Sequence, residues 1–150
     1  MIQDSQQVRV RYAETDQMGY VYYGNYAVYY EIARAELVRK IGIPYGEMER
    51  QQQILLPVVE LHVKYRNPAL YDELLTIRTQ VRERPTARIR FDHQIFNPRD
   101  ELVVEGHAAL AFFNARTQRP ERAPSNLLEC VDAYWGHDLS QDEPQPATES

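Results

Sequence analysis

The stretch Tyr12-Ala-Glu-Thr-Asp16-Gln-Met-Gly19-Tyr-Val-Tyr-Tyr-Gly-Asn25-Tyr26 leads directly into the most regular helical pattern of this chain. From residue 26 onward, apolar side chains recur at spacings of three and four, which predicts the apolar face of an α-helix. These residues are Tyr26, Tyr30, Ala33, Leu37 and Ile41. Asn25 is a favoured N-cap residue, and Gly42 is placed to end the helix. Val28 and Ile32 lie off this face, so we expect the protein to enclose the helix on more than one side.

Strand-like patterns flank the helix in the sequence. Residues 7–12 alternate, with Val8, Val10 and Tyr12 on one face, which predicts a half-buried strand before the helix. Further strand patterns follow the helix, at residues 56–66, 74–84, 87–96 and 101–115. One face of the first of these runs carries Val59, Leu61, Val63 and Tyr65. The last run is apolar throughout residues 108–113, as expected of a central strand that is covered on both faces.

The order of these elements predicts an α+β fold. Short turns between successive strands favour antiparallel pairing, so we expect a long central helix packed on a curved, five-stranded antiparallel sheet. Residues 45–53 are expected to be helical or irregular, and residues 125–135 to form a short helix capped by Ser125 or Asn126. Residues 1–135 therefore read as one domain. Residues 136–150 are polar, acidic and proline-containing, and we expect them to be disordered.

Composition excludes several classes of function. A net charge of −5 gives no broad basic field, which argues against a nucleic-acid partner. No apolar run approaches the roughly 20 residues that cross a bilayer, and the first residues lack the basic start and apolar core of a signal peptide. A lone Cys130 makes neither an internal disulfide nor a zinc site. We expect a cytoplasmic protein with no metal and no cofactor.

The loop before the helix holds two candidate carboxylates. Asp16 lies nine residues before Asn25, close enough to fold back over the helix start, where free backbone N–H groups favour negative charge. Strand alternation places Glu14 on the same side as Asp16, so spacing does not separate them. The simplest alternative for Asp16 is an aspartate that makes a local turn hydrogen bond. Gly19 supplies a backbone conformation that a side chain would hinder.

Other reactive side chains have simpler structural interpretations. Glu31 can pair with Arg34, and Glu36 with Lys40, at helical spacings. The four histidines are scattered without a metal-binding pattern, and His62 and His93 lie within strands, which favours structural roles. Neither a glycine-rich phosphate loop nor a GxSxG motif is present.

The whole pattern resembles the hotdog-fold acyl-CoA thioesterases of the 4-hydroxybenzoyl-CoA thioesterase type, and is similar to the bacterial Tol-Pal-associated acyl-CoA thioesterases. The resemblance begins with Tyr12-x3-Asp16-x2-Gly19-x-Val21-Tyr22-x2-Asn25-Tyr26 and continues with Glu31-x2-Arg34. It extends through Val63-x-Tyr65-x2-Pro68-Ala69-x-Tyr71-Asp72, Val104-Glu105-Gly106 and Arg119-Pro120. It spans residues 7–124 in the order that the predicted fold requires.

This resemblance implies a fold, an assembly and a site. The fold would be a hotdog, a long helix wrapped by an antiparallel sheet, and two copies would pair through a continued sheet into a homodimer or further into a homotetramer. The active site would lie at the dimer interface, where an acyl-CoA substrate is hydrolysed to a free acid and coenzyme A. Asp16 matches the catalytic carboxylate, and the backbone N–H of Tyr23 matches the group that polarises the thioester carbonyl. Tyr12 matches a residue that sits beside the carboxylate.

The remaining expectations concern substrate contacts and alternatives. The substrate-binding candidates are Gly19, Gly24, Asn25, Tyr26, Lys64 and Arg119, with Arg88, Arg116 and Arg122 as further candidates for coenzyme A phosphates. Many relatives carry a histidine near the positions of Tyr20 or Tyr23, which this chain lacks. Another hotdog branch carries its carboxylate within the helix, where Glu31 is the candidate. The alternative functions are a noncatalytic acyl-CoA-binding hotdog and a hydroxyacyl-thioester dehydratase, whose usual histidine is missing from the first 61 residues.

Overall fold

The structure is a computed structural model that describes residues 1–141. Its strands are β1 (Ile2–Arg9), β2 (Ile54–Leu55), β3 (Val58–Tyr65), β4 (Leu74–Val81), β5 (Arg88–Phe96), β6 (Leu102–Asn114) and β7 (Arg119–Glu121). Its helices are the single 3-10 turn η1 (Tyr12–Glu14) and the α-helices α1 (Asn25–Ile41), α2 (Tyr45–Arg50) and α3 (Ser125–Tyr134). The α-helices and the strands β3, β4, β5 and β6 agree with the sequence prediction, apart from shifted ends, whereas η1 was not predicted.

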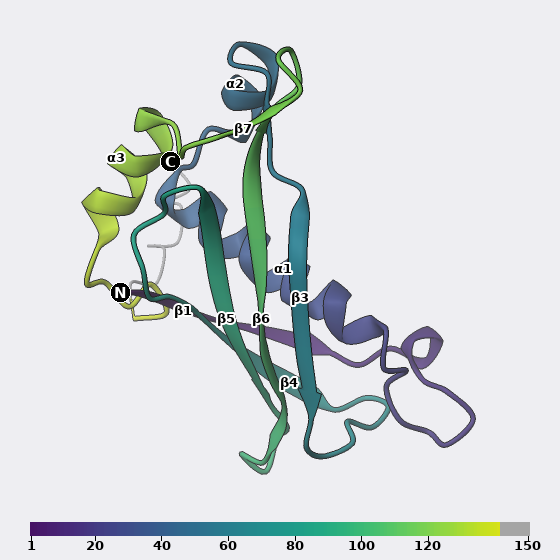
Figure 1. Cartoon of the computed structure of the whole chain (residues 1–150). Coiled ribbons are helices and arrows are strands. Elements are labelled where there is room, and N and C mark those ends of the chain that lie inside the picture. Colours follow the sequence, from purple (N-terminus) through teal and green to yellow (C-terminus); the bar gives the residue numbers. More distant parts are fainter. Residues whose placement is uncertain (142–150) are drawn as a thin grey trace, which may run out of the picture.

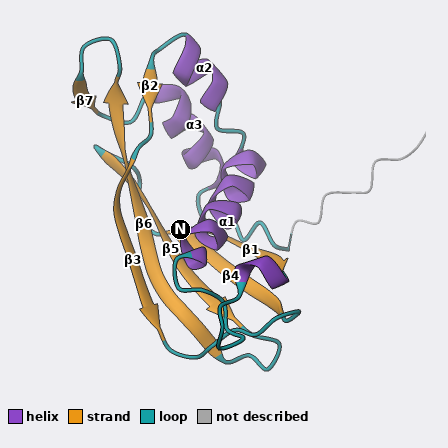
Figure 2. Cartoon of the chain, turned by 90° about the vertical axis from the view of Figure 1, so that its right-hand side faces the viewer, coloured by secondary structure: helices purple, strands orange, loops and turns teal. Residues whose placement is uncertain are grey.

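The main sheet has five antiparallel strands, as predicted, and their order is β1-β4-β5-β6-β3. It curves around α1, which lies on its inner side (Figure 2). The short strands β2 and β7, which the sequence analysis did not predict, pair with the last residues of β6. They lie with α2 at one end of the sheet, whereas the loop that precedes α1 lies at the other end (Figure 1). The expected α+β arrangement is confirmed.

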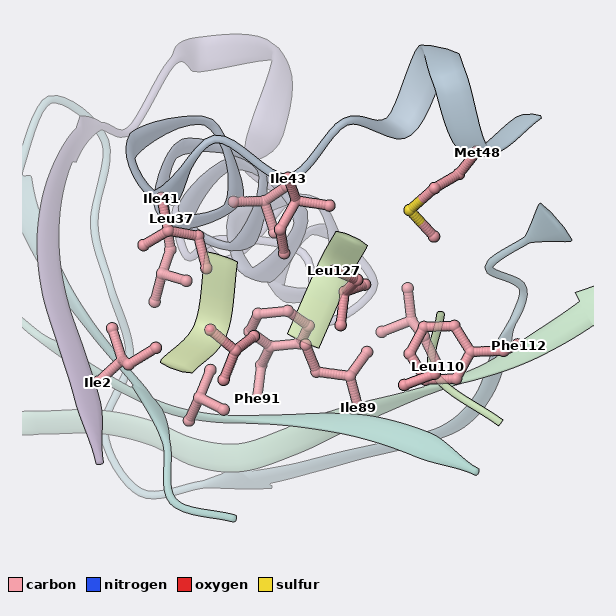
Figure 3. Close-up of a cluster of buried hydrophobic side chains, with 14 of the residues drawn as sticks. Ile2, Leu37, Ile41, Ile43, Met48, Ile89, Phe91, Leu110, Phe112 and Leu127 are labelled. Atoms are coloured by element: carbon pink, nitrogen blue, oxygen red, sulfur yellow. The ribbon is translucent and has the colours of Figure 1, made fainter. Parts of the chain in front are cut away.

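The predicted apolar face of α1 is buried against the sheet. Tyr26, Tyr30, Ala33, Leu37 and Ile41 are each at most 3% exposed. Leu37 and Ile41 contribute to a core that also includes Phe91 and Phe112 from the sheet and Leu127 from α3 (Figure 3). Gly42 ends the helix with a φ of 78°, a left-handed conformation that glycine adopts without steric cost. Asn25 is the first helical residue and Gly24 occupies the N-cap position, so the predicted N-cap was wrong by one residue.

The close approach of the β3 backbone and of Tyr30 explains the glycine in the middle of β6. A Cβ atom on Gly106 would lie 1.8 Å from the carbonyl oxygen of His62 and 2.8 Å from the hydroxyl of Tyr30. A side chain at residue 106 would therefore separate β3 from β6 or displace the helix. Beside this contact the Tyr30 ring stacks on His93, with 4.3 Å between the ring centroids.

Strand β3 forms an edge of the main sheet and is unusually apolar for an exposed strand. Val58, Val59, Leu61 and Tyr65 are between 46% and 53% exposed, and Val63 is half-buried. Within residues 1–141 the second edge of β3 pairs with no strand. The apolar face predicted for this strand, which carries Val59, Leu61, Val63 and Tyr65, is therefore only partly buried in a single copy of the chain.

Both ends of the domain differ from the prediction. The first strand spans Ile2–Arg9, and Tyr12 lies beyond it in η1 with 78% of its surface exposed, so its predicted burial with Val8 and Val10 was wrong. Residues 136–141 are ordered, because Leu139 N–H donates to Gln3 O at 2.7 Å and its side chain is buried. Disorder was wrongly predicted for these six residues, and residues 142–150 lie outside the described part.

Candidate active site

The loop of residues 10–24 is attached to the sheet at both of its ends. Val10 N–H donates to Glu73 O at 2.9 Å, and Val21 N–H donates to Ala69 O at 2.8 Å. These bonds bring the loop beside residues 65–73, about fifty positions later in the sequence, and direct the chain into α1. The loop therefore has a defined backbone position relative to the helix start.

Asp16 begins a tight turn within this loop. Its backbone N–H donates to Tyr20 O at 2.8 Å, and Gly19 N–H donates to Asp16 O at 3.0 Å. Gly19 has a φ of 77°, so the predicted need for glycine at this turn is confirmed. One carboxylate oxygen, Oδ1, accepts the N–H of Met18 at 2.9 Å, the local turn bond expected of a loop aspartate. The other oxygen, Oδ2, accepts no hydrogen bond from any residue in the described part of the chain.

Asp16 borders two clefts at once. The first, of about 350 Å³, has Asp16 on one side and Tyr23, Tyr26, Tyr65 and Arg66 among its other walls. The second, of about 650 Å³, lies between Asp16, Gly19 and the exposed rings of Tyr12 and Tyr71. The half-buried carboxylate thus stands at the junction of an aromatic recess and a wider, open groove.

Tyr23 faces the first cleft just before α1 begins. Its carbonyl accepts the hydroxyl of Tyr65 at 3.3 Å, while its N–H has no acceptor among residues 1–141. The same absence holds for the N–H of Gly24, the N-cap residue. Free N–H groups at the start of a 17-residue helix form a site that favours an anionic oxygen.

Glu14, the other candidate carboxylate of the loop, is enclosed by hydrogen-bond donors. It is only 7% exposed, and its oxygens accept hydrogen bonds from the backbone and guanidinium of Arg11 and from the hydroxyl of Tyr29. Burial alone would raise the pKa of Glu14, but these hydrogen bonds outweigh burial and hold the pKa below its usual range. The strand alternation, extended beyond Tyr12, predicted that Glu14 and Asp16 lie on the same side. The 3-10 turn η1 ends that alternation, so the two carboxylates lie in different environments.

The other predicted residues occupy different places. Tyr12 lines the wider cleft without a hydrogen bond between its hydroxyl and Asp16, and its ring lies edge-on to Tyr71 at 5.8 Å. Asn25 donates its side-chain N–H to Glu14 O at 2.9 Å, which is a structural contact. Tyr26 is a wall of the aromatic recess, and burial raises its pKa to about 12. Gly24 lies directly at the helix start.

Two predicted phosphate-binding residues lie away from both clefts. Lys64 is exposed on β3 and pairs in register with Glu105 of β6. Arg119 lies on β7 beside Asn114, whereas Tyr65 at the recess pairs with Val104, ten residues earlier on β6. Ten strand residues span about 33 Å. One copy of the chain therefore does not bring Arg119 to Asp16.

The two helix carboxylates, Glu31 and Glu36, also lie away from Asp16. Glu31 is exposed and lines a third cleft, of about 320 Å³, with Arg34, Tyr45 and Leu55. Glu36 pairs with Arg39 rather than Lys40, which instead binds the buried Asp4 at 2.8 Å. The predicted Glu36–Lys40 pair was therefore wrong.

Residues 65–68 complete the site and were not predicted as substrate contacts. The recess that Asp16 borders is also lined by Tyr65, Arg66, Asn67 and Pro68. These residues belong to a motif that supported the family resemblance. Residue spacing alone does not predict that they contact a loop about fifty residues earlier in the sequence. Arg66 also binds Glu105 at 2.9 Å, which holds a cation at the edge of the recess.

His93 is a core residue, as its position within a strand predicted. Its Nδ1 lies 2.8 Å from the hydroxyl of Thr79, and it is 1% exposed. Burial, with smaller contributions from Arg34 and His107, lowers the pKa of His93 to about 3. The ring therefore stays neutral inside the protein at physiological pH.

This buried imidazole predicts a loss of stability in mild acid. The folded pKa lies below the unfolded value of about 6.5, so protons bind preferentially to the unfolded chain as the pH falls below that value. Between about pH 7.5 and about pH 5, His93 should lower the free energy of unfolding by about 2 kcal/mol. Urea unfolding at the two pH values should show a smaller loss for His93→Gln than for the wild type. Equal losses would contradict this assignment.

The arrangement of a helix inside a curved antiparallel sheet, with a carboxylate and free amides where the helix begins, defines the hotdog class of thioester-processing proteins. A family profile described as the thioesterase-like superfamily matches residues 10–131. The chain belongs to this superfamily and is a thioester hydrolase. The recognised resemblance and the hotdog fold are confirmed.

Individual relatives support this assignment. The putative acyl-CoA thioesterase YneP of Bacillus subtilis is 36% identical over 99 residues, which cover 66% of this chain and 71% of YneP. The structure of DHNA-CoA thioesterase from Staphylococcus aureus is 35% identical, has a TM-score of 0.74, and matches over 90% of this chain and 85% of that chain. A 4-hydroxybenzoyl-CoA thioesterase shares the fold at 22% identity, with a TM-score of 0.76 over 85% of this chain and 97% of that chain.

Within residues 1–141, no group of three or more histidine, cysteine, aspartate or glutamate side chains is arranged to hold a metal ion. In the same part of the chain, every helix is too short or too polar to traverse a bilayer.

Proposed function

We propose that this protein hydrolyses an acyl-CoA thioester to a free carboxylic acid and coenzyme A, with Asp16 as the catalytic carboxylate. The observation that carries the proposal is the shared recess of Asp16 and Tyr23. Asp16 has one carboxylate oxygen, and Tyr23 has a backbone N–H just before α1, that form no hydrogen bond with residues 1–141. These are the two groups that attack on a carbonyl requires.

The chemistry follows from the weak resonance and good leaving group of a thioester. The Tyr23 N–H, supported by the helix dipole, would stabilise the negative charge that develops on the carbonyl oxygen. Asp16 would either take a proton from an attacking water or attack the carbonyl carbon itself. In both routes the carbon–sulfur bond breaks and the thiolate of coenzyme A leaves and takes up a proton. In the second route, water must then hydrolyse the anhydride between the acyl group and Asp16, which releases the free acid and restores the carboxylate. The geometry is compatible with both routes.

The walls of the two clefts suggest how the substrate would lie. Tyr20, Tyr23, Tyr26 and Tyr65 give the recess apolar, flat walls that suit the acyl group. Arg66 at the edge supplies a guanidinium for a phosphate of coenzyme A. Asp16 at the junction would then meet the thioester bond between these two parts.

We further propose that two copies pair through their β3 edges. A strand with exposed backbone groups and apolar side chains is a template for pairing with another strand. Antiparallel pairing would set the Tyr65 end of one β3 beside the Val58 end of the other. Because β7 lies beyond the Val58 end, its Arg119 would approach the Asp16 loop of the second copy. Such pairing gives the predicted role of Arg119 a physical basis.

The test is thiol release from a panel of acyl-CoAs, detected with a thiol-reactive dye. The purified wild type should release coenzyme A from at least one aromatic or short aliphatic acyl-CoA in a saturable manner. Binding of acyl-CoA without turnover would favour the noncatalytic alternative. Hydration or dehydration without thiol release would favour a dehydratase, which would need a histidine; none lines either cleft that holds Asp16.

A further inference from the structure

We propose that Glu14 is a positioning residue that holds Asp16 and the Tyr23 N–H in their relative geometry. The inference rests on the proposed hydrolase function, because it assigns a role to a residue that touches neither the thioester nor its oxyanion site. Glu14 bonds through its side chain to Arg11 and Tyr29, and through its backbone carbonyl to Tyr22 and Asn25, so it joins the loop to α1.

The carboxylate of Glu14 joins the beginning of the loop to the helix. Oε1 accepts the backbone N–H of Arg11 at 2.9 Å and the hydroxyl of Tyr29 at 3.0 Å, and Oε2 accepts the guanidinium of Arg11 at 3.1 Å. Tyr29 is fully buried in the second turn of α1. A buried, fully hydrogen-bonded carboxylate resists displacement, because moving it would leave its donors unpaired.

The backbone of Glu14 fixes the other end of the loop. Its carbonyl accepts the N–H of Tyr22 at 2.8 Å and the side-chain N–H of Asn25 at 2.9 Å. Tyr22 and Asn25 lie on either side of the segment that contains Tyr23. Asp16 follows Glu14 by only two residues and begins its own turn. Glu14 is therefore the point from which both reacting groups are positioned.

This connection matters because catalysis is sensitive to small displacements. A misplacement of about 1 Å in an otherwise intact site costs roughly 10²-fold in rate. In Glu14→Gln, the Nε2 donor would face the guanidinium donor of Arg11, so that part of the network would be replaced by a repulsive contact. The segment of residues 14–25 would then relax without loss of Asp16 or of the Tyr23 amide.

The experiment compares Glu14→Gln with a matched control, Asp4→Asn. Asp4 is also a fully buried carboxylate, bound by Lys40 at 2.8 Å and by Gln6 at 3.0 Å, but it lies on β1 away from the loop. Well below the melting temperature of either variant, Glu14→Gln should lower kcat by about 10- to 100-fold with little change in KM. Asp4→Asn should lose stability but keep the wild-type kcat. Equal kcat values in the two variants would overturn the proposal.

A second variant and a second readout keep the test independent of folding and turnover. Tyr29→Phe removes one hydrogen bond to Glu14 and should lower kcat by a few-fold, in a manner that is not additive with Glu14→Gln. Backbone NMR should show shifted Tyr23 and Gly24 amide resonances and faster hydrogen exchange in Glu14→Gln, but not in Asp4→Asn. If the wild type releases no thiol, the proposed function fails, and unchanged amides would separately refute the positioning role.

Discussion

Asp16→Asn is expected to lower kcat for thioester hydrolysis by about 10²–10⁴-fold. Asparagine keeps the size of the side chain and its Oδ1 bond to the N–H of Met18, so the turn should remain intact. It removes the negative charge and the carboxylate oxygen that no described residue binds. Binding of substrate should change little, and thiol-release kinetics would place the loss in kcat rather than in KM.

The matched control for this prediction is Glu31→Gln. Glu31 is exposed on α1 and lines a different cleft, so its loss of charge should leave kcat within about two- to three-fold of the wild type. Near wild-type turnover in Asp16→Asn, together with loss in Glu31→Gln, would assign catalysis to the helix carboxylate instead. Single-turnover hydrolysis in labelled water then separates the two routes, because label enters the Asp16 carboxylate only through a covalent intermediate.

Leu61→Lys should convert the proposed dimer into monomers and remove most of the activity. Leu61 is 49% exposed near the middle of β3, and a lysine there places an unpaired charge in the proposed apolar interface. A cost of about 2–4 kcal/mol would weaken dimerisation by roughly 30- to 1000-fold. Sedimentation velocity over a range of concentrations would measure the change, and thiol release would fall with the dimer fraction.

The control for the edge strand is Trp135→Lys. Trp135 is also a partly exposed apolar residue, at 39%, but it follows α3 and lies away from β3. This variant should keep the wild-type sedimentation and activity. A Leu61→Lys protein with unchanged assembly and turnover, or a fully active wild-type monomer, would refute the proposed role of the β3 edge.

Periodicity predicted α1 and the three central strands because their burial repeats locally. In β4 and β5, every second residue faces the helix, and Leu75, Ile77, Phe91 and Ile95 are all fully buried. The same reasoning wrongly predicted burial of Tyr12, because the alternation of β1 ends before a 3-10 turn that the sequence pattern did not indicate. It also missed β2 and β7, which are too short for a periodic signal and form only because the end of β6 extends beyond the main sheet.

In the candidate site, too, the sequence identified residues that are close in the chain but did not identify contacts between distant residues. Asp16, Gly19 and the start of α1 lie within ten residues of each other, so spacing and family resemblance identified them together. Spacing did not separate Glu14 from Asp16, because their difference depends on Arg11 and on Tyr29, one helical turn into α1. It also left the recess wall at Tyr65 and Arg66 unassigned, because that wall depends on a sheet edge about fifty residues away.

The order of residues was thus enough to specify an α+β architecture, the helix and its end at Gly42, and a candidate loop at the helix start, and the family resemblance identified the architecture as a hotdog. Those features arise from hydrophobic periodicity and backbone preferences, which act between near neighbours in the chain. Folding in three dimensions decided which carboxylate is buried and which is free, and which aromatic side chains surround the free one. Burial and hydrogen bonding of an ionisable group depend on all the atoms around it, and those atoms come from distant parts of the sequence.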